Sequence, residues 1–197
     1  MIDEELLYRF GAEVKSYEKD HFIFREARSP FYYYQVKKGS IKLNNYKEDG
    51  KEFIQNILSD GQSFGESLLF IDVLYPMNAV ALEDSEVLQL PKSRLFDLLE
   101  QHPYISLKIT KSLSERLYYK YIMLQNLSCS DPTTRLMSLL NYLKSFHHTK
   151  EQFSFRIPFT RQQVANLTGL CVETVIRNMK KLAKKDVIII KNRKIYY

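Results

Sequence analysis

The chain has 197 residues, of which 45% are apolar and 26% are charged, proportions that are typical of a folded globular protein and argue against a disordered one. Its charge is unevenly divided. Residues 131–197 carry 13 basic and 4 acidic side chains, a net charge of +9, whereas residues 1–130 carry a net charge of −3. A basic C-terminal third beside a mildly acidic remainder indicates that only the C-terminal part meets a polyanion.

The first ten residues, MIDEELLYRF, lack the apolar core of a signal peptide, and no apolar run approaches the length of a membrane span. The two cysteines, Cys129 and Cys171, are too few for a metal framework or for an iron–sulfur cluster with four cysteine ligands. We therefore expect a cytoplasmic protein with no membrane contact, no metal site and no cofactor.

Short strands separated by turns are predicted between residues 20 and 90. Gly39, Gly50 and Gly61 recur at a spacing of eleven residues, and Asp49-Gly50 is a typical hairpin tip. This spacing favours an antiparallel sandwich or barrel, in which each strand ends in a tight reversal. The predicted strands are Phe31–Tyr34, Ser40–Tyr46, Glu52–Leu58, Ala79–Leu82 and Glu86–Leu90.

Two helices are predicted next, one from a Ser93 cap to His102 and a longer one over residues 104–128. Apolar residues along the longer helix recur at steps of three and four. Such a seam either meets the same helix of a second copy or packs within its own chain. The seam residues are Ile109, Leu113, Leu117, Tyr121, Leu124 and Leu127.

A hinge is predicted at Ser130-Asp131-Pro132, because proline starts a helix but does not continue one. After it, the pattern predicts an amphipathic helix over residues 133–146, a polar loop at His147-His148 and a strand over residues 153–157. The final residues, VIIIKNRKIYY, predict a two-stranded hairpin with Asn192-Arg193 at its turn, which is a basic wing suited to phosphates.

The segment Thr160–Leu182 predicts a DNA-binding helix-turn-helix. Thr160 and Gln163 form a capping box for a short first helix, and Gly169 supplies the sharp turn. The second helix presents side chains that suit base edges and phosphates, although an ordinary helical hairpin is an alternative interpretation. These outward side chains are Glu173, Thr174, Arg177, Asn178, Lys180 and Lys181, opposite inward Val175, Met179 and Leu182.

The motifs Phe64-Gly65-Glu66, Asn126-Leu127 at the end of the long helix, Arg135, TRQQVANLTG and ETVIRNMKKL together resemble the Crp/Fnr superfamily of bacterial transcription regulators. The resemblance covers about residues 19–197 and implies an α+β fold. Its parts are an N-terminal antiparallel β-sandwich (a double-stranded β-helix or jelly roll) at 1–103, a dimerisation helix and hinge at 104–130, and a winged helix-turn-helix at 131–197. It further implies a homodimer that binds double-stranded DNA at an inverted repeat, a small-molecule effector in the sandwich and, for an activator, RNA polymerase as a partner.

The same resemblance gives Glu173 and Arg177 the principal base-contacting positions, where a carboxylate and a guanidinium address C and G edges. Val172 stands where the member that senses cyclic AMP has an arginine. Because Val172 donates no hydrogen bond but can touch a thymine methyl, we expect a different half-site at that base pair. The residues assigned to phosphates are Thr160, Arg161, Gln162, Thr174, Lys180 and, on the wing, Arg193.

In the family's nucleotide site, a Gly-Glu pair and an Arg-Ser pair ten residues beyond the glutamate hold the ribose and phosphate. This chain keeps Gly65 and Glu66 but has Pro76 and Met77 at the second pair, so the charge-assisted contact to phosphate is lost. Lys120 and Tyr121 stand at the long-helix positions that the resemblance puts near the adenine. We expect an unknown effector other than cyclic AMP, or a Glu66 that bonds only its own loop.

The leading hypothesis is therefore a dimeric, sequence-specific transcription regulator. The alternative is a cyclic-nucleotide-binding signalling module whose C-terminal domain docks protein. An enzyme is not expected, because the chain has no lysine-bearing phosphate loop, no His-Glu-x-x-His and no Gly-x-Ser-x-Gly.

Overall fold

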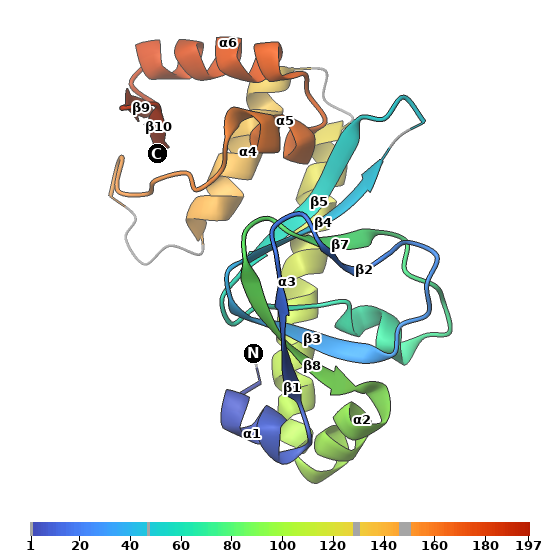
Figure 1. Ribbon diagram of the computed structural model, residues 1–197. Helices are drawn as coiled ribbons and strands as arrows, with labels where there is room; N and C mark the ends of the chain where they lie inside the picture. The colour runs from blue at the N-terminus through green and yellow to red at the C-terminus, as the bar shows by residue number, and fades with distance from the viewer. Residues whose placement is uncertain (1, 47, 128–130, 146–150) are drawn as a thin grey trace. The chain divides into compact units, whose positions relative to one another are not determined.

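The computed structural model describes the backbone of residues 2–46, 48–127, 131–145 and 151–197. Cys129, Ser130, His147 and His148 lie outside the described residues, as do the side chains of residues 123 and 125–127, Leu127 included. The chain divides into two compact units, residues 1–115 and residues 116–197, and the long helix contributes to both (Figure 1). The three-part division predicted from the sequence stays a prediction.

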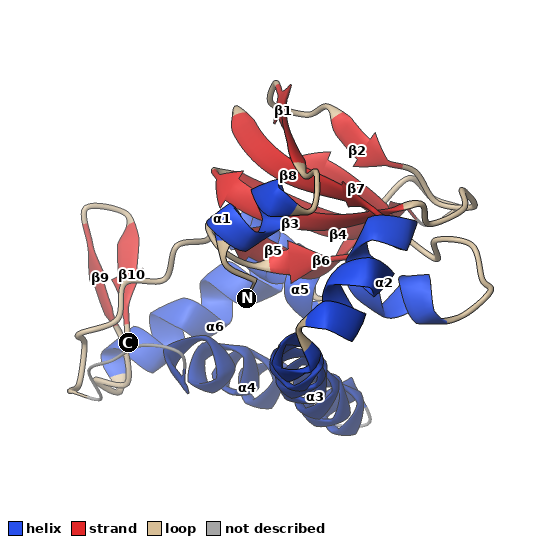
Figure 2. Cartoon of the chain, turned by 90° about the horizontal axis from the view of Figure 1, so that it is seen from below, coloured by secondary structure: helices blue, strands red, loops and turns tan. Residues whose placement is uncertain are grey.

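The first unit is a sandwich of two four-stranded antiparallel sheets, with strand orders β1-β8-β3-β6 and β2-β7-β4-β5 (Figure 2). The predicted α+β fold class with an N-terminal β-sandwich is thereby confirmed. The strands are β1 (Glu13–Tyr17), β2 (Phe22–Phe24), β3 (Tyr32–Lys38), β4 (Ser40–Tyr46), β5 (Glu52–Ser59), β6 (Ser63–Phe64), β7 (Asn78–Ala81) and β8 (Ser85–Pro91).

The interior of the sandwich is filled by apolar side chains from both sheets. Tyr34 and Val36 lie two positions apart on β3, so both side chains point into this interior. Ile41 and Leu43 do the same on β4. Burial of each such side chain contributes about 1.5–3 kcal/mol, so the predicted period-two pattern defines this core.

A second core lies on the other face of β3 and β8, where Tyr33, Leu88 and Leu90 are buried beneath helices. The helices are α1 (Glu4–Arg9), α2 (Lys92–Gln101) and the first half of α3 (Pro103–Leu127). Helix α1, which the pattern analysis did not predict, is capped by the Asp3 carboxylate. The predicted Ser93 cap is wrong, because α2 begins at Lys92 with Pro91 at the N-cap and no side-chain cap bond.

Gly39, between β3 and β4, is a position where any side chain is strongly destabilising. Its φ is +105°, and an added Cβ lies 2.8 Å from the Ser85 Cβ and closer still to the Ser85 hydroxyl oxygen. That hydroxyl is held in place, because it accepts a hydrogen bond from the Ser40 amide at 3.2 Å and donates one to the Glu83 carbonyl at 2.7 Å.

We expect Gly39→Ala to lower the free energy of unfolding by the left-handed strain of about 1–2 kcal/mol plus an overpacking cost of about 1–3 kcal/mol. Gly61→Ala is the matched control, since Gly61 has φ +79° but open space around its Cβ position. Urea denaturation measures both. Equal losses in the two variants would contradict the steric conflict with Ser85.

The second unit contains α4 (Pro132–Ser145), α5 (Arg161–Thr168), α6 (Val172–Lys184) and a hairpin of β9 (Ile189–Lys191) and β10 (Lys194–Tyr196). The predicted strand over residues 153–157 is present in part. Phe153 has a φ of +63°, but residues 155–157 pair with the end of the chain, through hydrogen bonds of Phe155 with Tyr197 and of Ile157 with Ile195 and a bridge between Arg156 and Tyr196. No helix among the described residues has the length and apolarity needed to cross a bilayer. The core of this unit includes Leu136, Leu139, Leu140, Val164, Ala165, Val175, Met179 and Ile195.

Candidate nucleic-acid interface and effector region

Helices α5 and α6 are joined by a tight turn, as the sequence predicts. The Thr160 hydroxyl oxygen accepts a hydrogen bond from the Gln163 amide at 3.1 Å, and the Gln163 side chain accepts one from the Thr160 amide at 2.8 Å. Gly169 ends α5 in the left-handed conformation, with φ +67°. These local signals set where the first helix starts and where the chain reverses into α6.

Helix α6 has one buried face and one strongly polar face. Val175, Met179 and Leu182 are buried, whereas Glu173, Arg177 and Lys180 are exposed. The prediction that Asn178 points outward is wrong. Asn178 is buried, accepts a hydrogen bond from the Thr133 hydroxyl at 3.1 Å and donates one to the Thr174 carbonyl at 2.9 Å. An amide side chain among apolar ones is tolerated here because both of its polar atoms are bonded.

The wing turn lies beside the start of α5. Arg161 donates a hydrogen bond from Nη1 to the carbonyl oxygen of Arg193 at 2.5 Å. Asn192 and Arg193 both have positive φ, +47° and +61°, the pattern of a type I′ hairpin turn. The structure therefore brings together two residues that the sequence assigned separately to phosphates.

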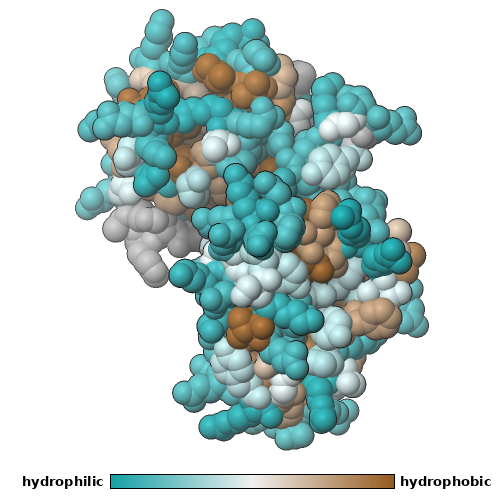
Figure 3. Space-filling view, in the orientation of Figure 1, coloured by the Kyte–Doolittle hydropathy of each residue, from teal (hydrophilic) through white to brown (hydrophobic). Residues whose placement is uncertain are grey.

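The other predicted phosphate contacts are on the same two helices. Gln162 is exposed and donates to the Asn166 side chain at 2.9 Å, and the half-buried Thr174 hydroxyl lies 3.0 Å from the Cys171 thiol. Hydrogen bonding to Thr174 lowers the pKa of Cys171 below its ordinary value. Figure 3 shows that the surface over α5 and α6 is mainly hydrophilic, with small hydrophobic areas. Such a surface suits a polyanion with exposed base edges.

The apolar seam of α3 divides into two parts. Ile109 is only 4% exposed and, with the half-buried Leu113, packs in the helical core of the first unit. Their assignment to an interface between copies is therefore corrected, because this half of α3 needs that face to cover the sandwich. Past Leu113 the stripe is exposed, at 47% for Leu117, 59% for Tyr121 and 62% for Leu124.

Three exposed large apolar residues of α3 that the seam prediction omitted are Tyr104, at 52%, Leu107, at 73%, and Tyr118, at 65%. Tyr118 lies one turn from Tyr121 and next to Leu117, so it widens the stripe. The predicted seam omits Tyr118 because Tyr118 lies one position away from Leu117 and so falls outside the spacing of three and four residues.

Glu66, one of the predicted effector contacts, is fully buried at the start of a short 3₁₀-helix, η1 (Glu66–Phe70). Its Oε1 accepts a hydrogen bond from the Ser63 hydroxyl at 2.5 Å. Gly65 precedes it with φ +75°, a conformation that a residue with a side chain adopts only under strain. The carboxylate is thus hydrogen-bonded within its own loop, by the Ser63 side chain.

Aromatic rings fill the sandwich next to Gly65. The Phe24 and Tyr75 rings stack with centroids 3.7 Å apart, and the Tyr34 and Phe64 rings stack at 5.2 Å. A Cβ on Gly65 would lie 3.4 Å from both Phe24 and Tyr75. Burial raises the pKa of Tyr34 and of Tyr75 far above the ordinary value, so both phenols stay neutral at physiological pH. A ligand in this part of the sandwich would therefore meet neutral aromatic rings.

Of the remaining predicted effector residues, Pro76 and Met77 bring no charge to that region. Pro76 is exposed and its carbonyl accepts a hydrogen bond from Asn45 at 2.7 Å, while Met77 is half-buried against the aromatic core. Lys120 and Tyr121 belong to the second unit, and both are exposed.

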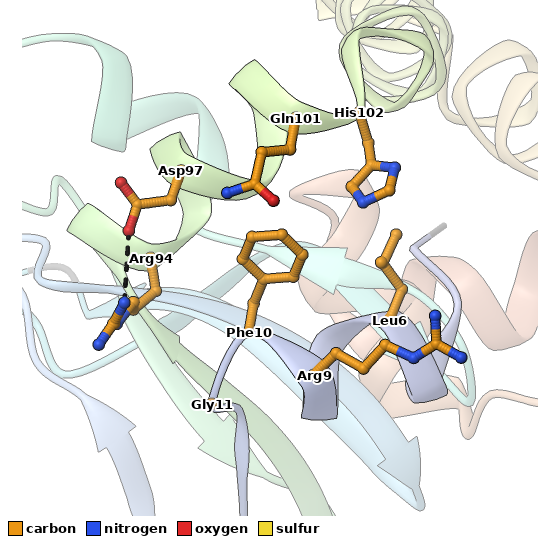
Figure 4. A pocket seen from close by; sticks show the side chains of 8 residues that line it. All are labelled: Leu6, Arg9, Phe10, Gly11, Arg94, Asp97, Gln101 and His102. Carbon is orange, nitrogen blue, oxygen red and sulfur yellow. Dashed lines mark ion pairs between the residues drawn. The ribbon is translucent and has the colours of Figure 1, made fainter.

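A separate pocket of about 550 Å³, which the sequence gave no signal for, lies between α1 and α2 (Figure 4). Arg94 pairs with Asp97 at 3.6 Å at one side of it, and the Phe10 ring meets His102 edge-on with centroids 5.8 Å apart. The C-terminal ends of both helices border this space, and the negative end of the α1 dipole favours the Arg9 cation in its last turn. The lining residues are Leu6, Arg9, Phe10, Gly11, Arg94, Asp97, Gln101 and His102.

Comparison with known proteins agrees with both units. The cyclic nucleotide-binding domain family matches residues 14–102, and the Crp-like helix-turn-helix domain family matches residues 134–196. The cAMP-activated global transcriptional regulator CRP of Pasteurella multocida is 31% identical over 157 residues, which cover 79% of this chain and 75% of that protein. The fumarate and nitrate reduction regulatory protein of Vibrio cholerae is 28% identical over 182 residues, which cover 91% of this chain and 72% of that protein.

Among solved structures, the c-di-GMP responsive global regulator CLP of Xanthomonas campestris has the same fold, with a TM-score of 0.78 at 22% identity over 98% of both chains. A β-sandwich, a long helix and a winged helix-turn-helix define a DNA-binding regulator of transcription. The chain belongs to the Crp/Fnr family of such regulators, which are not enzymes. The predicted family is thereby confirmed.

Proposed function

We propose that this regulator acts as a homodimer that reads an inverted-repeat DNA site through Glu173 and Arg177 and responds to an effector other than cyclic AMP. The observation that carries the DNA-reading part is the exposed polar face of α6, which begins directly after the capped α5 and its turn. Glu173 and Arg177 are one helical turn apart on that face, so both reach the same stretch of major groove.

The surrounding charges support the same orientation. Lys180 continues the exposed face beyond Arg177, and Arg193 lies at the wing turn that Arg161 contacts. These cations suit the two phosphate backbones on either side of a groove, where they fix register without reading sequence. The Thr160 hydroxyl oxygen already accepts the capping hydrogen bond of α5. Thr160 would therefore contact a phosphate by donating its hydroxyl proton.

The test is selection of preferred duplexes from a random pool, followed by titration of the chosen duplex over a series of salt concentrations. We expect an inverted repeat with half-site centres about 34 Å apart, and an affinity that falls linearly on a log–log plot against salt. A protein that binds no duplex at low ionic strength, or that binds all sequences alike, contradicts the proposal.

The exposed end of the α3 stripe supports a second copy as partner. Leu117, Tyr121 and Leu124 follow the spacing of an interhelical seam and have no cover within the described part of their own unit. A symmetric dimer buries the same stripe on both copies and gives the inverted repeat its twofold symmetry. We therefore propose a cytoplasmic homodimer that binds a symmetric DNA site.

Several features argue against cyclic AMP as the effector. Pro76 and Met77 supply neither a charge nor a hydroxyl, Glu66 is engaged by Ser63, and neutral rings occupy the adjacent interior. The similar proteins also differ in their effectors, since CRP of Pasteurella multocida is cAMP-activated whereas CLP of Xanthomonas campestris is c-di-GMP responsive. Membership of the family therefore does not identify the effector, which depends on the residues of each chain.

We expect isothermal calorimetry with cyclic AMP and with cyclic GMP to show no binding at millimolar nucleotide, because an unpaired phosphate charge loses more solvation than this site returns. Binding in the micromolar range would contradict the expectation of a different effector. Micromolar binding by a protein that selects no duplex would favour the alternative of a cyclic-nucleotide-binding module that docks protein. Where a duplex has been selected, binding to it is the control on folding.

A further inference from the structure

Ile176 is an exposed apolar residue at one edge of the polar face of α6. It is 40% exposed and lies between Val175, which is buried, and Arg177, which is exposed. The inward face of the helix is already occupied by Val175, Met179 and Leu182, so packing of the domain gives Ile176 no buried place.

Helical spacing makes Ile176 a neighbour of the residues proposed to read bases. Glu173 precedes it by three positions and Lys180 follows it by four, so all three share one side of the helix. Val172, which is half-buried, precedes Ile176 by four positions and lies on the same edge. Val172 and Ile176 therefore form a short apolar strip, bordered by charged side chains, along the surface that faces DNA in the proposed function.

The major groove contains one apolar group that such a strip can cover. Each base pair presents hydrogen-bond donors and acceptors there, and only thymine adds a methyl group, at C5. An isoleucine placed over a C·G pair desolvates the cytosine amino group and the guanine acceptors without replacing their hydrogen bonds, which is unfavourable. Over a thymine, the same side chain removes two apolar surfaces from water.

We infer that the strip of Val172 and Ile176 selects thymine by contact with its C5-methyl group, with Ile176 as the main determinant. The inference rests on the proposed function and adds a requirement that Glu173 and Arg177 do not impose. The half-site contains at least one thymine whose methyl group, rather than its hydrogen-bonding edge, is recognised.

The experiment uses the full chain and the duplex that selection gives. Each thymine of the half-site is replaced in turn by deoxyuridine in both half-sites, which removes one methyl group and keeps every hydrogen bond. We expect at least one position to lower affinity about fourfold for each half-site, the factor equivalent to about 0.8 kcal/mol for one buried methyl group. Fluorescence anisotropy at fixed salt measures the change.

The variant Ile176→Ser is expected to bind the deoxyuridine and thymidine duplexes equally at that position. Ile190→Ser is the matched control, since Ile190 is 38% exposed in the same domain but lies on the wing strand β9. That control should keep the full deoxyuridine penalty. Circular dichroism verifies that both variants remain folded.

Three results overturn the inference: a selected half-site without thymine, equal binding of every deoxyuridine duplex by the wild type, or a penalty that persists undiminished in Ile176→Ser. Each of these leaves sequence-specific DNA binding intact, so the proposed function survives them. Absence of any sequence preference in the wild type removes the proposed function and the inference together.

Discussion

Arg177→Ala is expected to bind the selected duplex more weakly than the wild type by about 1–3 kcal/mol for each half-site, and to lose preference at one base pair. The exposed guanidinium lies one helical turn from Glu173 on the polar face of α6. A bidentate contact to guanine is lost without repacking the domain, since the buried face of α6 is unchanged. Competition titrations with single base-pair variants of the duplex measure both effects.

The matched control is Lys184→Ala, which removes an exposed cation from the last turn of the same helix. A cation there acts on phosphates, so its loss should weaken binding to all duplexes alike and reduce the salt slope by about one at most. If Arg177→Ala behaved in the same uniform way, Arg177 would be a phosphate contact and the base-reading assignment would be wrong.

The second large effect is expected at the exposed end of α3. Leu124→Asp should convert the dimer to a 23.4 kDa monomer at micromolar concentration, because twofold symmetry brings two new carboxylates into one apolar seam. An uncompensated buried charge costs about 3–5 kcal/mol, enough to lower a dimer constant by more than a hundredfold. Sedimentation velocity measures the mass, and affinity for the inverted repeat should fall in parallel.

Lys111→Asp introduces the same carboxylate on an exposed position of the same helix, away from the stripe of Leu117, Tyr121 and Leu124. We expect that variant to remain dimeric. A Leu124→Asp protein that stays dimeric while Lys111→Asp dissociates would show that a different face of α3 joins the two copies.

The elements that sequence analysis predicted well are those with strong local signals. The capping box of Thr160 and Gln163, the left-handed Gly169 and the Asn192-Arg193 turn each depend on neighbours within a few residues, and all are present. Five strands of the sandwich, β3, β4, β5, β7 and β8, were likewise predicted from alternation and regularly spaced turns, whereas β1, β2 and β6 were not.

The errors concern choices that the rest of the fold decides. The periodicity of α3 is continuous, yet Ile109 is needed to cover the sandwich whereas Leu124 is not, and no local signal marks the change between them. Asn178 was placed outward because it is polar, but Thr133, distant in sequence, gives it a buried partner. The strand expected at residues 153–157 pairs only from Phe155 onward, because Phe153 has a positive φ that the phenylalanine side chain gives no reason to expect.

The bond between Thr133 and Asn178 has a mechanical consequence. The Asp131 carboxylate holds the first turn of α4 through the Thr133 and Thr134 amides, at 3.2 and 3.1 Å, and the Thr133 hydroxyl reaches α6. The first residues after the predicted hinge are thus coupled to the helix proposed to enter the groove. Because the Thr133 hydroxyl ties the start of α4 to the middle of α6, we expect a rotation of α4 to carry α6 with it as one body.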